Sequence, residues 1–159
     1  MADPTDPVDD ETKDVDIDGD GVPDGSERVT SRMIDHSGDG EADEFELTIE
    51  RTLDLDGDGR AETSSTTVIS YVDLDGDGSV DQVRESTVTR TDADGDGVAE
   101  MVEVEASTLT DVDRDGLADT VDRGSAIGTD VDDDQTIEAS EITIQSETGG
   151  RPAPGTRMP

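Results

Sequence analysis

Seven short segments of this chain place carboxylates at fixed, alternate positions, a spacing suited to binding cations. The first segment, DIDGDGVPD, begins at Asp16, and each of the others begins 19 residues after the one before it. Counted from the first Asp, columns one and five are Asp in all seven segments, and column three is Asp in six. Column nine is always Asp or Glu, so these four columns hold 27 of the 45 acidic residues. A disordered acidic tract has no reason to keep such a period, so we expect a repeated metal-binding loop.

The side chains of four columns and the backbone of a fifth are the expected ligands. Column one contains Asp16, Asp35, Asp54, Asp73, Asp92, Asp111 and Asp130. Column three contains Asp18, Ser37, Asp56, Asp75, Asp94, Asp113 and Asp132. Column five contains Asp20, Asp39, Asp58, Asp77, Asp96, Asp115 and Asp134. Column nine contains Asp24, Asp43, Glu62, Asp81, Glu100, Asp119 and Glu138. A backbone carbonyl is expected from column seven, which contains Val22, Glu41, Arg60, Ser79, Val98, Leu117 and Thr136.

Column twelve is acidic in five segments and leaves two interpretations open. Its acids are either extra ligands or ordinary polar strand residues: Glu27, Glu46, Glu103, Asp122 and Glu141.

Calcium is the metal that this donor set favours. It takes six to eight oxygen ligands in a flexible geometry, whereas magnesium demands a tight octahedron and zinc and copper prefer His and Cys. The chain has one His and no Cys. Gly in column six fits the sharp turn of such a loop, because Gly reaches positive φ at no steric cost. We expect six or seven Ca²⁺ ions, with the seventh site weakest, because Gln135 replaces this Gly and Asp133 stands where the other segments have Gly or Arg.

The segments resemble calcium loops of several families. Asp16, Asp18, Asp20, Gly21 and Glu27 fit the whole twelve-residue EF-hand pattern, but an EF-hand needs flanking helices, and the stretches between these loops are rich in Thr, Val, Ile and Ser. The form DxDxDGxxD is similar to the loops of thrombospondin type 3 and integrin-type repeats, which those families place between strands or irregular segments. The resemblance implies the metal site and no whole fold.

The elements that must position these loops are predicted to be strands. Columns ten to nineteen are rich in β-branched residues, and in the second repeat Phe45, Leu47 and Ile49 alternate with polar residues. We expect an all-β repeat protein. Its exact period favours a β-solenoid, and the absence of a consistent second turn keeps open an antiparallel β-meander with the calcium loops as connections. Columns two and eight are mostly apolar and are expected to face inward as a small seam.

Composition alone indicates disorder. Leu, Ile, Val and Phe make up about 19% of the chain, and the net charge is −34. We therefore expect a protein that is largely unfolded without metal and ordered by it. The predicted organisation is an acidic flexible lead over 1–15, a seven-repeat calcium-binding domain over 16–148, and a Gly/Pro-rich flexible tail over 149–159.

Charge and motifs exclude several classes of function. An acidic field repels nucleic acid, no segment reaches the length of an apolar membrane span, and no secretory signal opens the sequence. No catalytic motif is present, so an enzyme is not expected. The sequence favours a noncatalytic calcium-binding module that acts as a spacer or interaction surface, secreted or at the cell surface, and it indicates no particular protein partner. The alternatives are a calcium buffer or sensor, a lanthanide-binding protein and, from another class, an acidic disordered solvating protein.

Overall fold

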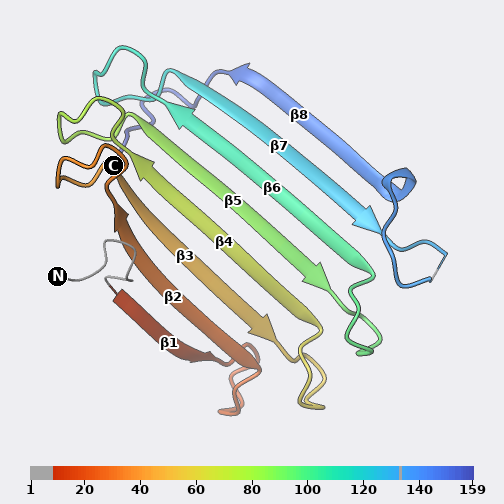
Figure 1. Cartoon of the computed structure of the whole chain (residues 1–159). Helices are drawn as coiled ribbons and strands as arrows, with labels where there is room; N and C mark the ends of the chain where they lie inside the picture. Colours follow the sequence, from red (N-terminus) through yellow and green to blue (C-terminus); the bar gives the residue numbers. More distant parts are fainter. Residues whose placement is uncertain (1–8, 133) are drawn as a thin grey trace.

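The computed structural model describes residues 9–132 and 134–159, which form one eight-stranded sheet (Figure 1). The elements in chain order are β1 (Asp9–Val15), β2 (Gly25–Ile34), β3 (Glu44–Leu53), β4 (Thr63–Val72), β5 (Gln82–Thr91), β6 (Met101–Thr110), β7 (Thr120–Thr129), the short 3₁₀ turn η1 (Ala139–Glu141) and β8 (Ile142–Gly150). The strands lie in sequence order, and every neighbouring pair is antiparallel. The prediction of an all-β repeat protein is confirmed.

The arrangement is the antiparallel meander, not the solenoid that the exact period favours. Columns ten to nineteen form one uninterrupted ten-residue strand, so the repeat contains a single reversal of the chain and needs no second turn. In a solenoid, equal columns of successive repeats would stack. Here the strands run in opposite directions, so that Val29 pairs with Ile49 and Ile49 pairs with Thr67.

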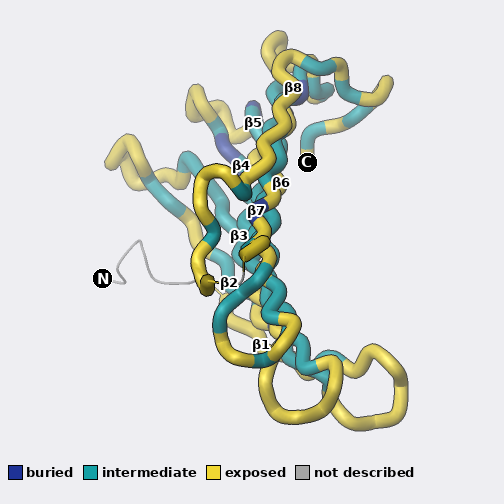
Figure 2. The backbone as a smooth tube through the Cα atoms, turned by 90° about the vertical axis from the view of Figure 1, so that its right-hand side faces the viewer, coloured by how far each residue is buried: buried dark blue, intermediate teal, exposed yellow. Residues whose placement is uncertain are grey.

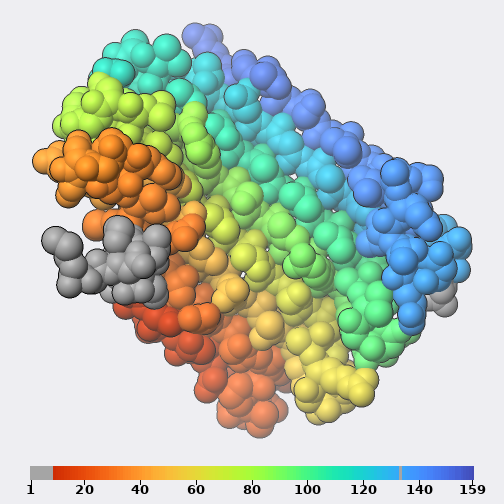
Figure 3. All heavy atoms as spheres, viewed as in Figure 1, coloured from red at the N-terminus to blue at the C-terminus, as the bar shows by residue number. Residues whose placement is uncertain are grey.

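The seven connecting loops alternate between the two ends of the sheet. We name them L1 (16–24), L2 (35–43), L3 (54–62), L4 (73–81), L5 (92–100), L6 (111–119) and L7 (130–141). L1, L3, L5 and L7 lie at one end, and L2, L4 and L6 lie at the other (Figure 1). The space-filling view shows the repeats crossing the sheet in sequence order, with the loops at its two ends (Figure 3).

Neighbouring loops at the same end are joined by backbone hydrogen bonds that continue the sheet ladder. In each case the column-one amide donates to the column-nine carbonyl of the loop two repeats earlier. The five bonds, 2.7–2.9 Å long, run from Asp54 to Asp24, Asp73 to Asp43, Asp92 to Glu62, Asp111 to Asp81, and Asp130 to Glu100. Each loop is therefore held beside the loop that lies two repeats away in the sequence.

The sheet is a single layer, and among the described residues no other element covers either face (Figure 2). Val72 and Val121, 6% and 1% exposed, are the buried hydrophobic residues of the described chain. Most strand side chains are half-buried and rely on cross-strand neighbours. The predicted alternation in β3 is present: Phe45 stacks on Tyr71 with ring centroids 6.0 Å apart, and Leu47 pairs with Ile69.

The predicted apolar seam does not form in column two and forms only in part in column eight. Column-two side chains are among the most exposed hydrophobic groups, with Leu74 at 60% and Val131 at 75% exposure. In column eight, Pro23, Ala42 and Ala61 are exposed, whereas Val80, Ala99, Ala118 and Ile137 are half-buried. The loops project beyond the ends of the strands (Figure 2), and Ile137 is a column-eight side chain that lies against the sheet, next to Gly128.

Both ends of the described chain differ from the predicted flexible segments. Residues 9–15 of the predicted lead form β1, paired with β2, while residues 1–8 lie outside the described residues. At the other end, β8 includes Gly149 and Gly150. The tail beyond it lies along L6, where the Ala118 amide donates to the Thr156 carbonyl at 2.9 Å and the Met158 amide donates to the Gly116 carbonyl at 3.1 Å.

Cross-strand ion pairs stabilise the charged sheet at its N-terminal edge. Glu27, 8% exposed, accepts hydrogen bonds from Lys13 at 2.6 Å and from Arg51 at 2.5 Å. These two cations lower the pKa of the Glu27 carboxyl, with Lys13 the larger influence. Glu27 is therefore a strand residue whose charge is paired with cations on the two neighbouring strands.

Replacing Gly25 with Ala is expected to destabilise the sheet by about 1–3 kcal/mol, the usual range for overpacking. A Cβ at position 25 would lie 1.9 Å from the Thr52 carbonyl oxygen, so the β2–β3 backbone must move. The matched control is Gly124→Ala in β7, where the nearest atom would be 3.8 Å away. Urea unfolding in identical buffer measures both variants, and equal stability of the two would contradict the close approach at Gly25.

Replacing Glu27 with Gln is expected to lower the unfolding temperature at neutral pH and to have less effect in acid. A lowered folded-state pKa gives stability that is fully present above the ordinary Glu value of 4.5 and is lost progressively as the pH falls from there through the lower folded-state pKa. Thermal unfolding at neutral pH and below pH 4.5 measures this difference. Glu11→Gln on the exposed β1 edge is the control, and a Glu27→Gln deficit that persists in acid would show that packing, not charge, is lost.

Candidate metal sites

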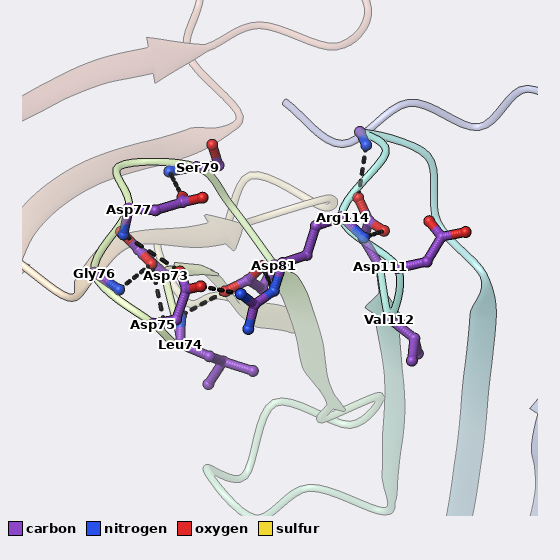
Figure 4. A network of polar contacts seen from close by, with 12 residues as sticks. Asp73, Leu74, Asp75, Gly76, Asp77, Ser79, Asp81, Asp111, Val112 and Arg114 are labelled. Carbon is purple, nitrogen blue, oxygen red and sulfur yellow. Dashed lines mark hydrogen bonds and ion pairs between the residues drawn. The ribbon is translucent and has the colours of Figure 1, made fainter.

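Each loop is wound around its column-one carboxylate. In L4, Asp73 accepts the Gly76 amide on Oδ1 and the Gly78 amide on Oδ2, both at 2.7 Å (Figure 4). The same pair of bonds, from columns four and six, occurs in every loop from L1 to L6. Asp side chains that bond their own backbone in this way stabilise tight turns. The repeated Asp therefore shapes the loop as well as supplying charge.

Two backbone positions in each loop from L1 to L6 adopt the left-handed conformation. In L4, Gly76 and Gly78 have φ of 77° and 87°. Column six was expected to be a sharp turn, and column four, which is Gly in five of its seven positions, has the same left-handed conformation in L1 to L6. Arg114 in column four and Gln135 in column six take φ of 62° and 70°, and they are the two non-Gly residues with positive φ in the described chain.

Columns five and seven form a second constant contact. In all seven loops, the column-seven amide donates to the column-five carboxylate at 2.7–3.0 Å, as Ser79 does to Asp77. This bond fixes the backbone of Val22, Glu41, Arg60, Ser79, Val98, Leu117 and Thr136, the residues predicted to offer carbonyl ligands.

Column nine closes each of the first six loops. Its carboxylate accepts the column-two amide at 2.5–2.8 Å, as Asp81 accepts Leu74 in L4. The chain thereby folds back until columns one, three and nine face one another in L1, L3, L4 and L5. This bond explains why column nine is always acidic.

The result is a series of carboxylate clusters that could hold a metal ion. In five groups, one oxygen from each member lies within 4.8 Å of those from the others. L3 and L5 contribute four carboxylates each, and L1, L4 and L6 contribute three: Asp54, Asp56, Asp58 and Glu62; Asp92, Asp94, Asp96 and Glu100; Asp16, Asp18 and Asp24; Asp73, Asp75 and Asp81; Asp111, Asp113 and Asp115. In L2, Ser37 occupies column three and donates its hydroxyl to Asp35 at 3.2 Å.

L7 is closed by a different residue from the other loops. Glu141 in column twelve accepts the Val131 amide at 2.8 Å, the bond that column nine makes elsewhere. It also accepts the Glu138 amide at 3.0 Å. η1 brings Glu141 into this position, so L7 has the length of the twelve-residue pattern.

The other four column-twelve acids lie on strands, where their contacts are with neighbouring strands. Glu27 binds Lys13 and Arg51, Glu46 binds Arg32 at 2.8 Å, and Asp122 accepts the Gly149 amide at 2.5 Å. Glu103 lies in β6 opposite Thr89 and Ile127. The structure thus brings one of the five column-twelve acids into a loop.

Repulsion among the carboxylates is visible in their pKa values. Asp115, and after it Asp119, raise the pKa of Asp113, while Asp134 raises the pKa values of Asp132 and Glu138. Amide donors act in the opposite direction, since Gly78 lowers the pKa of Asp73. A bound cation would offset the remaining repulsion.

Comparison with known proteins returned no relative: no protein-family model, no curated protein and no solved structure matches this chain. Within the described residues, no helix has the length and apolar character needed to cross a membrane.

Replacing Glu141 with Ala is expected to open L7, while Glu138→Ala leaves it closed. The Glu141 carboxylate accepts the Val131 amide, so its removal exposes that amide to solvent. Hydrogen exchange of Val131 is expected to accelerate by about tenfold, as for the loss of one hydrogen bond to a charged group. Faster exchange in Glu138→Ala than in Glu141→Ala would contradict this assignment.

Proposed function

We propose that this protein is a noncatalytic calcium-binding repeat module with six or seven Ca²⁺ sites, one in each loop. The observation that carries the proposal is the convergence of four carboxylates in L3 and again in L5. Their even spacing in a nine-residue loop suits a cation that takes many oxygen ligands. L7 remains the weakest proposed site because Gln135 holds a backbone conformation that costs a non-Gly residue about 1–2 kcal/mol.

Calcium is proposed over other metals because the clusters offer only oxygen. His36 lies in L2, but its Nε2 atom is 2.8 Å from the Glu44 carboxylate and it belongs to none of the five clusters described above. Zinc and copper would need nitrogen or sulfur ligands, and magnesium would need a tighter octahedron. Trivalent lanthanides prefer the same hard oxygen ligands and would compete with calcium.

Calcium is also proposed to drive folding. A one-layer sheet with Val72 and Val121 as its buried hydrophobic residues has little apolar burial to offset chain entropy. Binding energy that exists only in the folded state adds to stability. The apo chain is therefore expected to be largely unfolded.

The proposed use is a calcium-stiffened spacer or interaction surface at the cell exterior. Each repeat adds one strand and widens the sheet by about 4.8 Å. Extracellular modules bind calcium at about 10⁻⁴ to 10⁻³ M, the range suited to sites exposed at the ends of a sheet. A sensor would need an apolar surface that appears on binding, and this chain has no Trp and only one Phe and one Tyr.

Calcium is expected to convert the chain from a disordered state to a sheet. Far-UV circular dichroism with calcium and with chelator measures the folding, and calorimetric titration measures the number of ions. An unchanged spectrum together with no binding heat at millimolar calcium would overturn the proposal.

A triple variant locates one of the sites. Asp92→Asn, Asp94→Asn and Asp96→Asn together remove three carboxylates of the L5 cluster, so the stoichiometry is expected to fall by one. The control removes three exposed carboxylates from β1 through Asp9→Asn, Glu11→Gln and Asp14→Asn. An equal loss of bound calcium in both variants would indicate diffuse charge attraction instead of a defined site.

A further inference from the structure

Arg114 reaches from its own loop into the carboxylate cluster of the neighbouring one. It lies in L6, and its Nη1 atom donates to Oδ2 of Asp75 in L4 (Figure 4). Its Nε atom is 3.6 Å from Oδ1 of Asp81, also in L4. The two loops are adjacent because the Asp111 amide bonds the Asp81 carbonyl at 2.9 Å.

Each of the two carboxylates that face Arg114 uses its other oxygen to accept a backbone amide of L4. Asp75 uses Oδ1 to accept the Asp77 amide, and Asp81 uses Oδ2 to accept the Leu74 amide. The Asp75 side chain is 28% exposed and that of Asp81 is 6% exposed, so water screens these charges only in part. A cation of the protein itself therefore already occupies the open side of this cluster.

We propose that the Arg114 guanidinium is a built-in competitor for the metal ion in L4, so that binding there requires Arg114 to leave. This inference rests on the proposed calcium-binding function and concerns the regulation of one site. A divalent ion among Asp73, Asp75 and Asp81 would repel the guanidinium and would take the same two oxygens. L4 consequently fills at higher calcium concentration than L3 or L5.

The other inter-loop arginine makes a different contact and provides the comparison. Arg60 of L3 donates from Nη1 to the Gly95 carbonyl of L5 at 2.5 Å. Its partner is a neutral carbonyl oxygen. The L5 carboxylates are also contacted by a neighbouring loop, but by the uncharged amide of Gln135, whose Nε2 atom donates to Oδ2 of Asp96 at 3.0 Å. Each arginine thus bridges two loops that share an end of the sheet, Arg60 at one end and Arg114 at the other, but of the two only Arg114 contacts a carboxylate that a metal ion would use.

Site-resolved NMR titration of the full chain tests the competition, begun at the calcium concentration at which circular dichroism already shows the folded sheet. The amides of Gly76 and Gly78 report L4, those of Gly57 and Gly59 report L3, and the Arg114 Nε–H signal reports the guanidinium. In the unmodified protein, the Arg114 signal is expected to change at the calcium concentrations that fill L4. In Arg114→Ala, which keeps a Cβ at the same positive φ, the L4 midpoint is expected to fall by roughly three- to tenfold, the effect of one or two ion pairs.

Two control variants separate competition from loop strain. Arg60→Gln is expected to leave the L4 midpoint unchanged. Arg114→Gly relieves the backbone of L6 as well, so it is expected to lower the midpoints of both L4 and L6. An L4 midpoint in Arg114→Ala equal to that of the unmodified protein, with calcium still bound at every loop, would overturn the competition alone. Loop amides that do not respond to calcium in any variant would overturn the proposed function itself.

Discussion

Repulsion among the carboxylates of one loop is the force that this structure has to balance. Each loop joins two paired strands, so the strands stay in register only while the acids between them are held close together. Backbone amides provide part of the balance, because columns two, four, six and seven all donate to carboxylates of their own loop. The raised pKa values of Asp113 and Asp132 show that the amides do not complete it. The proposed divalent ion among the carboxylates would offset the repulsion that the amides leave.

The same constraint explains how a one-layer sheet can be stabilised without a second layer. A sheet normally covers one face with a second layer, and its core supplies most of the stability. Here both faces are open over the described residues, and the repeated polar interactions lie at the ends of the strands instead. The five backbone bonds between same-end loops extend the ladder into the loops, so each loop supports its neighbour. Stability is thus distributed along the repeat in the manner of a linear array.

Much of this architecture could be predicted from the residues. The spacing of the acidic columns predicted where the loops lie. The alternation of Phe45, Leu47 and Ile49 predicted a strand and the face on which its apolar side chains lie. The choice between solenoid and meander depended on the second turn, whose absence was the better signal than the exact period. Closure of L7 by Glu141 depends on η1, and the reach of Arg114 depends on which loops share an end. The column-twelve pattern offered Glu141 as a candidate but did not show that it alone of the five would enter a loop. The reach of Arg114 does not follow from local sequence, because the alternation of the meander sets which loops share an end.

Reversal at every loop also ties the direction of the chain to the number of repeats. Eight strands bring Asp9 and Gly150 to the same end of the sheet, at its two opposite edges (Figure 1). One additional repeat would send the chain out at the other end. Two would preserve the exit direction and widen the sheet by only about 10 Å. Arrays of this kind can therefore lengthen by pairs of repeats without redirecting the polypeptide that follows.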